Sequence, residues 1–286
     1  MAFFEFSSEN HPSRKVNYAE KNHKSLLEKN TYQYMKEAYE GSGAFQNGTA
    51  LRPKRFEELE DYDERRELSY YRNIIGKVVQ SMFLPVFTAK NKVEVNGGEK
   101  TPERLENFLK DCDGRGTSLF KKVKEIVEYN LVYGLNITVV ENVSENAETL
   151  QESIKQRKFP YVFNVKPQSV KHIDLDRFGN PISLLYYVRD GKINNKDREI
   201  YRYYDANITS EVYYEKEEEN PLNFTYIEDT YTELNLEKPP FFVSYWSKPE
   251  EGDWNVHPDL YGIARVNTAI YNLDSELRKV LRNQGF

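Results

Sequence analysis

The segment SLFKKVKEIVEYNLVYGLNITVVE, residues 118–141, changes its hydrophobic period at one glycine. Before Gly134, over Ser118–Tyr133, apolar residues recur at the three- and four-residue intervals of one helix face. After it, Leu135–Glu141 is rich in β-branched residues and predicts a strand. Glycine adopts the left-handed backbone that closes a helix, so Gly134 is expected to be the C-terminal cap. This helix-to-strand change predicts an α+β fold, with helices before it and short strands after it.

Further helices are predicted upstream of this point. The segment Lys21–Tyr39 has helical spacing and ends at the loop 41–48, which holds three glycines. One long helix is expected from about Arg55 to Phe83, ended by Pro85. The residues Thr101-Pro102-Glu103 predict a helix start, because threonine is a good N-cap and proline suits the first helical position.

The middle of the chain predicts a β-rich module of short strands. We expect a hairpin whose first arm is Ile182–Arg189 and whose tight turn is Asp190-Gly191. The other segments rich in β-branched and aromatic residues are Tyr161–Lys166, Val170–Leu175, Glu199–Tyr204, Glu211–Tyr214, Phe224–Ile227 and Phe241–Trp246.

The last segment predicts a long helix with one apolar stripe. Six aliphatic residues follow the 3-4-3-4-3 spacing of a helix that packs along another helix: Ile263, Val266, Ile270, Leu273, Leu277 and Val280. The other face is expected to be polar, with Arg265, Asn272, Ser275, Glu276, Lys279 and Arg282. Two arrangements are open: the stripe packs on its own domain, or it packs on neighbouring copies or a long partner helix.

Charge and cysteine content limit the possible functions. The chain has 286 residues and a formal net charge of −6, whereas an independent duplex-DNA binder is normally basic. From Asp205 to Asp253, 13 acidic residues stand against 3 basic ones, so this stretch is expected to repel phosphate. Cys112, the single cysteine, excludes an intramolecular disulfide and is expected to fill a core position. No stretch is long and apolar enough to predict a membrane span.

No spacing of residues points to catalysis. The sequence has no phosphate-binding glycine loop, no dinucleotide fingerprint and no nucleophile elbow, and its four histidines lack the spacing of a zinc protease. Asp174 and Asp176 lack the later ligands of a calcium loop, so a plain turn is expected there. We therefore expect no catalytic, cofactor-binding or metal-binding residue, and no cofactor.

Three stretches together resemble the portal proteins of tailed bacteriophages. They are LSYYRNIIGKVVQ (68–80), NVKPQSVKHI (164–173) followed by RFGNPI (177–182), and DLYGIARVNTAIYNLDSEL (259–277). Portal proteins often carry a similar tyrosine-rich stretch before an apolar helix, then a strand, a glycine turn and a second strand. The third stretch is similar to their helix that descends from the wing into the stem. The three stretches occur in the same order across residues 30–286.

The resemblance implies a structural protein with a defined set of partners. It implies a homo-oligomeric, usually dodecameric, ring at the unique capsid vertex, through which double-stranded DNA is packaged and ejected without sequence-specific binding. The implied partners are the terminase large subunit, the major capsid or scaffolding protein and a head–tail adaptor. The implied location is the virion, with assembly in the host cytoplasm. The resemblance implies neither a cofactor nor a catalytic residue.

The residue patterns and the resemblance together predict how the chain is organised. We expect an N-terminal arm at 1–20 and a wing-like α+β domain at 21–257, helical over 21–133 and β-rich over 134–250. Residues 258–286 are expected to begin a long stem-like helix. Portal subunits are usually longer, so we expect this chain to lack their clip, returning stem helix, tunnel loop and crown.

Two other classes of function are open. A different head–tail adaptor or toroidal structural protein would share the helical-then-β layout, and the mass of the native assembly distinguishes it from a portal ring. A metal-dependent nucleic-acid enzyme would need scattered carboxylates to converge on a metal ion, and nuclease activity with magnesium or manganese would reveal it.

Overall fold

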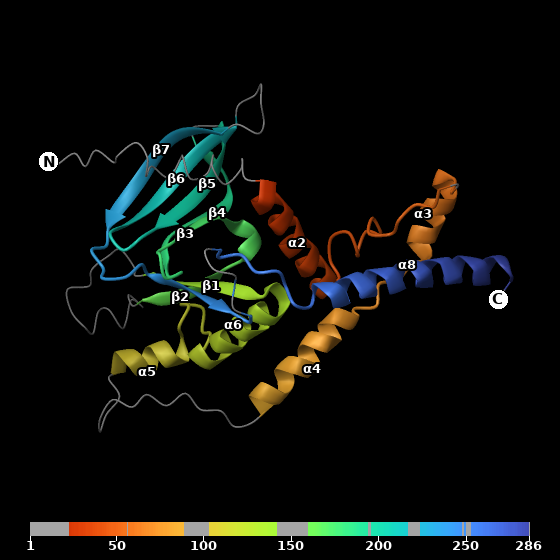
Figure 1. The fold of residues 1–286 in the computed structure, drawn as a ribbon, viewed down its shortest axis with the longest axis horizontal. Coiled ribbons are helices and arrows are strands. Elements are labelled where there is room, and N and C mark those ends of the chain that lie inside the picture. The colour runs from red at the N-terminus through yellow and green to blue at the C-terminus, as the bar shows by residue number, and fades with distance from the viewer. Residues whose placement is uncertain are drawn as a thin grey trace.

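Helices and strands occupy different stretches of the chain, which is an α+β fold (Figure 1). The computed structural model describes residues 23–55, 57–88, 103–141, 160–193, 196–216, 224–247, 249 and 253–285. The expected arm at 1–20 and the predicted helix start at Thr101-Pro102 lie outside the described residues. The helices are α2 (His23–Glu40), α3 (Leu59–Leu68), α4 (Ile74–Thr88), α5 (Glu103–Lys110), α6 (Leu119–Tyr133) and α8 (Tyr261–Asn283).

The strands form two antiparallel sheets. The first has the order β2-β1-β8, and the second runs β3-β4-β5-β6-β7 in chain order. The strands are β1 (Leu135–Glu141), β2 (Tyr161–Val165), β3 (Val170–Leu175), β4 (Pro181–Ile193), β5 (Lys196–Tyr204), β6 (Ile208–Lys216), β7 (Phe224–Glu233) and β8 (Phe241–Tyr245). A short 3-10 turn, Pro167–Ser169, joins β2 to β3 and so leads from the first sheet to the second.

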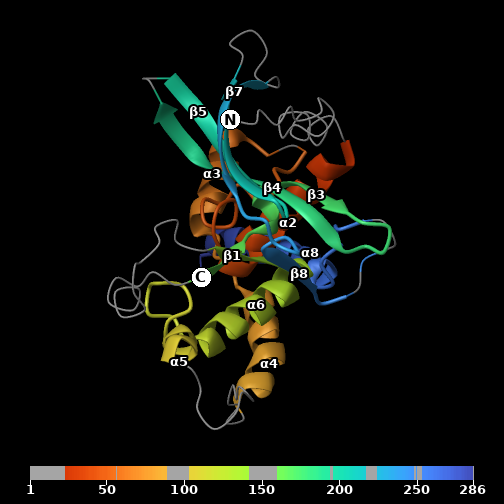
Figure 2. The same ribbon diagram turned by 90° about the vertical axis from the view of Figure 1, so that its left-hand side faces the viewer.

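One hydrophobic core joins the two sheets to the helices. It contains Met35 of α2, Leu131 of α6, Ile137 of β1, Leu184 of β4 and Tyr271 of α8, all of them buried. Figure 2 shows α6 and α4 on one side of the first sheet, with the second sheet on the other side. In Figure 1, α8 extends away from both sheets, and α3 lies beside its far half. Most of α8 therefore does not pack against either sheet.

The long helix predicted from Arg55 to Phe83 is wrong, because the chain breaks into α3 and α4. Between them, Ser69 is extended, and the side chains of Tyr71 and Asn73 donate to the carbonyls of Ala38 (2.8 Å) and Tyr39 (2.6 Å). Asn73 also caps α4, since its Oδ1 accepts from the Gly76 N–H at 2.7 Å. These hydrogen bonds to the end of α2 compensate for the helical ones that the break removes.

Pro85 does not end α4, which continues to Thr88. A proline inside a helix removes one hydrogen bond to the carbonyl four residues earlier, here that of Ser81. Both Ser81 and Pro85 are exposed, so water can satisfy that carbonyl. The prediction that Pro85 ends the helix is therefore wrong, because an exposed helix can accommodate the lost hydrogen bond.

The turn predicted at Asp190-Gly191 is also wrong. Both residues lie within β4, opposite Glu199 and Arg198 of β5, and the pairing of the two strands continues to Ile193 and Lys196. A Cβ on Gly191 would stand 2.8 Å from Cδ1 of Ile200. The glycine thus allows a close approach across the hairpin instead of forming its turn.

Gly134 caps α6 as predicted, with φ of 82° and its N–H donating to the Asn130 carbonyl at 2.9 Å. We expect Gly134→Ala to lower the free energy of unfolding by roughly 1–3 kcal/mol, because an alanine there adopts a strained backbone. Its Cβ would also lie 2.8 Å from Cγ2 of Val256. Chemical denaturation would measure the loss. Gly262→Ala is the matched control, because Gly262 lies in α8 with open space around it, and it should be neutral or slightly stabilising. Equal losses in both variants would contradict this explanation.

Candidate assembly surface on the C-terminal helix

Helix α8 docks on the rest of the chain through small and polar side chains. Its 23 residues span about 35 Å. The buried members of the helix are Ala264, Asn267, Tyr271 and Ser275. Tyr271 contributes the aromatic contact, with its ring centroid 5.5 Å from that of Tyr71 and 6.2 Å from that of Phe45. The polar members of this face are buried because each of them meets a specific group on a neighbouring element.

Asn267 satisfies the start of another helix. Its Oδ1 accepts from the N–H of Ile74, the first residue of α4, at 2.9 Å. The first N–H groups of a helix lack partners within the helix, so an acceptor from a neighbour stabilises the end. This bond fixes α8 to α4 at a defined position along both helices.

A buried arginine, paired with a carboxylate beside α3, fixes α8 to α3 through a hydrogen bond. Arg65 is fully buried, and its Nε and Nη2 donate to both carboxylate oxygens of Glu57 at 2.7 Å. Its Nη1 donates to Oγ of Ser275 at 2.9 Å, and Nη2 also donates to the carbonyl of Arg52 at 2.8 Å. Hydrogen bonds from Arg65 hold the pKa of Glu57 at about 2. The charge is buried at low cost because its partners satisfy most of its donors.

Exposed ion pairs continue this contact toward the end of the helix. Lys279 reaches Asp61 at 2.7 Å, and Arg282 reaches Glu64 at 3.2 Å. Exposed pairs each contribute little to stability. The buried groups therefore determine how α8 is oriented, and the exposed pairs only add to them.

The apolar stripe of α8 faces away from the domain. Ile263, Val266, Ile270, Leu273, Leu277 and Val280 are exposed, by 38% to 66%, and Leu281 beside them is exposed too. The interpretation that the stripe packs on its own domain is therefore wrong for the part of the chain that the structure describes. Contiguous exposed apolar residues on a helix are typical of an interaction surface. That this surface meets other copies of the chain stays a prediction.

The expected polar face of α8 is only partly correct. Ser275, placed there with Asn272 and Lys279, is buried beneath Arg65 instead of exposed to solvent. Asn272 accepts at 2.9 Å from the backbone N–H of Arg52. The contributions of Arg65, Glu57 and Asn267 were not predicted, because nothing in the spacing of charged residues marks a pair separated by eight positions as buried.

The acidic residues considered for metal binding have other roles. Oδ1 of Asp176 accepts from the backbone N–H groups of Phe178 and Asn180, both at 2.8 Å, which is the predicted turn. The Asp174 carboxylate contacts His172, at 2.6 Å, and Ser183. Within the described segments, no group of three or more His, Cys, Asp or Glu residues is arranged to hold a metal ion. The described helices also include none with the length and apolar character needed to cross a bilayer.

The ion pair beneath α8 should make stability depend on acid pH. Folding lowers the carboxyl pKa of Glu57 from 4.5 to about 2. The ionised Glu57 therefore contributes its full stabilisation of the folded state above pH 4.5, and this contribution is lost as the pH falls toward 2. We expect the loss to be about 3 kcal/mol, since each pKa unit corresponds to about 1.4 kcal/mol. Urea denaturation at a series of pH values would measure it. The Glu57→Gln variant should show a smaller change over the same range, and equal changes in both proteins would contradict the assignment.

No protein-family model and no curated protein sequence matches this chain.

Proposed function

We propose that this chain is a structural ring subunit of the portal type, which assembles with other copies through the exposed apolar stripe of α8. The observation that carries the proposal is the orientation of that helix. Six aliphatic residues at heptad spacing face solvent, while the opposite face is attached to the domain by hydrogen bonds. A stripe of this length is matched by a second long helix, which a neighbouring copy can provide.

The resemblance of three stretches to portal proteins supplies the biological setting of the proposal. In that setting the ring occupies the unique capsid vertex of a virion, and double-stranded DNA passes through it. Terminase, the capsid or scaffolding protein and a head–tail adaptor would dock on it. The subunit would act by shape, with no cofactor and no reacting residue.

The acidic stretch Asp205–Asp253 is compatible with such a role. Its negative charge disfavours a tight grip on DNA phosphates, and a channel component must let DNA slide. Part of this stretch, including 217–223, lies outside the described residues. Glu211 within it is already paired with Arg202 at 2.8 Å.

Native mass spectrometry of the purified chain tests the proposal directly. A portal ring predicts one dominant species of about twelve copies of the 33.8 kDa chain. A stable but much smaller oligomer would favour the adaptor or toroidal protein instead. A monomer at every concentration, or DNA hydrolysis that requires magnesium or manganese, would contradict the proposal.

A further inference from the structure

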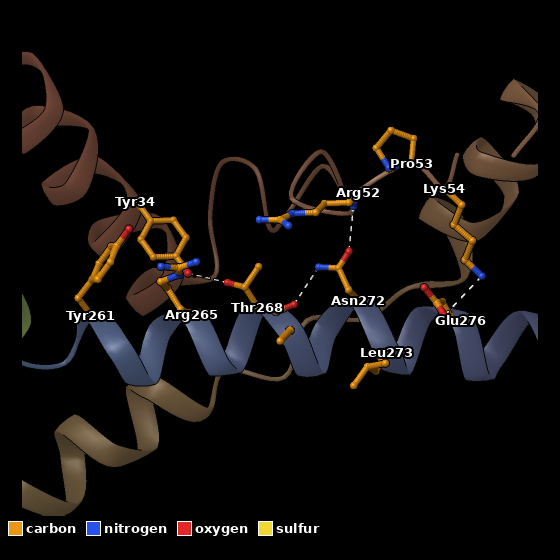
Figure 3. Close-up of a pocket in the computed structure, with 11 residues that line it drawn as sticks. Tyr34, Arg52, Pro53, Lys54, Tyr261, Arg265, Thr268, Asn272, Leu273 and Glu276 are labelled. Carbon is orange, nitrogen blue, oxygen red and sulfur yellow. Dashed lines mark hydrogen bonds and ion pairs between the residues drawn. The ribbon is translucent and has the colours of Figure 1, made fainter. Parts of the chain in front are cut away.

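A groove runs along α8 beside the segment that holds Arg52 and Lys54 (Figure 3). Its volume is about 830 Å³, within the range of sites for small organic ligands. Tyr34 and Tyr261 lie at one end, and Glu276 lies at the other. The groove also includes Leu273, so it borders the apolar stripe without coinciding with it.

Three cationic side chains line the groove, and they are not equally compensated. Lys54 lies 3.5 Å from Glu276, at the far end. The guanidinium groups of Arg52 and Arg265 have no ion pair or hydrogen bond to any residue that the structure describes. Figure 3 shows Arg52 extending along the groove toward the end where Tyr34 and Arg265 lie. The positive charges of Arg52 and Arg265 thus lie toward the same end of the groove, beside Tyr34.

The backbone beneath Arg52 is held firmly. Its N–H donates to Oδ1 of Asn272 at 2.9 Å, and its carbonyl accepts from the buried Arg65 at 2.8 Å. Arg265 rises from the helix itself. Both side chains therefore start from fixed backbone positions on opposite walls of the groove, although their ends are exposed.

The positive charges of both guanidinium groups act to lower the pKa of one hydroxyl, that of Tyr34. The Thr268 hydroxyl donates its single proton to the Ala264 carbonyl at 3.0 Å. In the 2.7 Å contact between the Tyr34 and Thr268 hydroxyls, Tyr34 is therefore the donor. The Tyr34 oxygen can also accept a hydrogen bond. Burial raises the pKa of Tyr34, while the positive charges of Arg265 and Arg52 act in the opposite direction. The two arginines and this oxygen therefore share one electrostatic environment.

We propose that this end of the groove binds a phosphate group, held by Arg52 and Arg265. A carboxylate has two oxygens, and one guanidinium can engage both of them. A phosphate offers further oxygens and a second negative charge, so it matches two arginines that approach from opposite walls. The rest of the groove, which continues along Thr268 and Asn272 toward Glu276, has room for a nucleoside. The ligand class is a nucleotide, either free or within a polynucleotide strand. This inference does not depend on ring formation.

Calorimetric titration of the full chain tests the site with three phosphate-bearing probes, inorganic phosphate, adenosine monophosphate and a single-stranded oligodeoxynucleotide, and with a polyglutamate peptide as a carboxylate probe. We expect binding of phosphate-bearing probes that weakens by about tenfold or more in Arg52→Gln/Arg265→Gln. Preference for the monophosphate would identify a free nucleotide as the ligand. Tighter binding of the oligonucleotide, with strong salt dependence, would identify a polynucleotide.

The matched control is Lys110→Gln/Arg115→Gln, which removes the same charge at exposed positions away from α8 and should bind as the parent does. The melting temperature of both double variants should stay near that of the parent, because the replaced side chains are exposed. Equal binding by parent and groove variant, no binding of any phosphate-bearing probe, or binding of a polyglutamate peptide in their place would each overturn the proposal.

Discussion

Replacing Ile270 and Leu273 by aspartate is expected to abolish assembly and leave the subunit folded. Both side chains are exposed in the single chain, by 39% and 66%, so the new carboxylates would face water there. Exposed substitutions of this kind typically change the free energy of unfolding by about 0.5 kcal/mol or less. In an interface between copies, the same carboxylates would be buried without partners, at a cost of several kcal/mol for each pair of neighbours. The ring species should then disappear from the native mass spectrum.

The control for this variant is Leu59→Asp/Leu236→Asp. These leucines are also exposed, by 76% and 45%, but they lie outside α8. The control should assemble as the parent does. Circular dichroism melting beside the mass measurement separates the cases. Cooperative loss of all structure in the α8 variant would mean that the stripe is part of the domain core, and persistence of the ring would mean that assembly uses another surface.

Replacing Arg65 by methionine should cause a larger loss of stability than Gly134→Ala. The Glu57 carboxylate, only 5% exposed, would stay buried with its main partner removed, and Ser275 and the Arg52 carbonyl would lose their donor. Breaking one side of a buried ion pair costs about 3–5 kcal/mol. For a chain of this size, the melting temperature should fall on the order of 10 °C.

The double variant Glu57→Leu/Arg65→Met tests the explanation. It removes both charges, so no unpaired carboxylate is left, and it should recover a substantial part of the lost stability. Thermal unfolding followed by circular dichroism measures both proteins. A loss below about 1 kcal/mol in the single variant, or no recovery in the double one, would show that the pair is not important for the attachment of α8.

The sequence predicted the elements well where hydrophobic period and local chemistry agree. Leu135–Glu141 and Val170–Leu175 were predicted with the bounds that the structure has. Gly134 was correctly predicted as a cap, because a left-handed glycine after a helical run is a local signal. The predictions at Pro85 and Asp190-Gly191 failed because the structure at these positions does not depend on local sequence alone. At Pro85 it depends on the exposure of the helix, and at Asp190-Gly191 on pairing with the neighbouring strand β5.

The stripe on α8 was predicted from its spacing, but the side on which the helix docks was not. A hydrophobic pattern suggests that the aliphatic face is the buried one. Here Asn267 is buried because it accepts a hydrogen bond from the first N–H group of α4. Ser275 is buried because it accepts a hydrogen bond from the Arg65 guanidinium. Such partners come from segments some two hundred positions away in sequence, so spacing within the helix cannot reveal them.

The hydrogen bonds along the docked face of α8 have a consequence for symmetry. Side chains at 267, 268, 272 and 275 bond to α4, α2, the segment before α3, and α3, so the helix cannot roll about its own axis. In a closed ring of identical copies, every interface repeats the same rotation, and a small error at each one accumulates around the circle. A helix free to roll would present its stripe at a different angle in each copy and yield open chains. Attachment through directional hydrogen bonds gives each copy the same angle, which closure of the proposed ring requires.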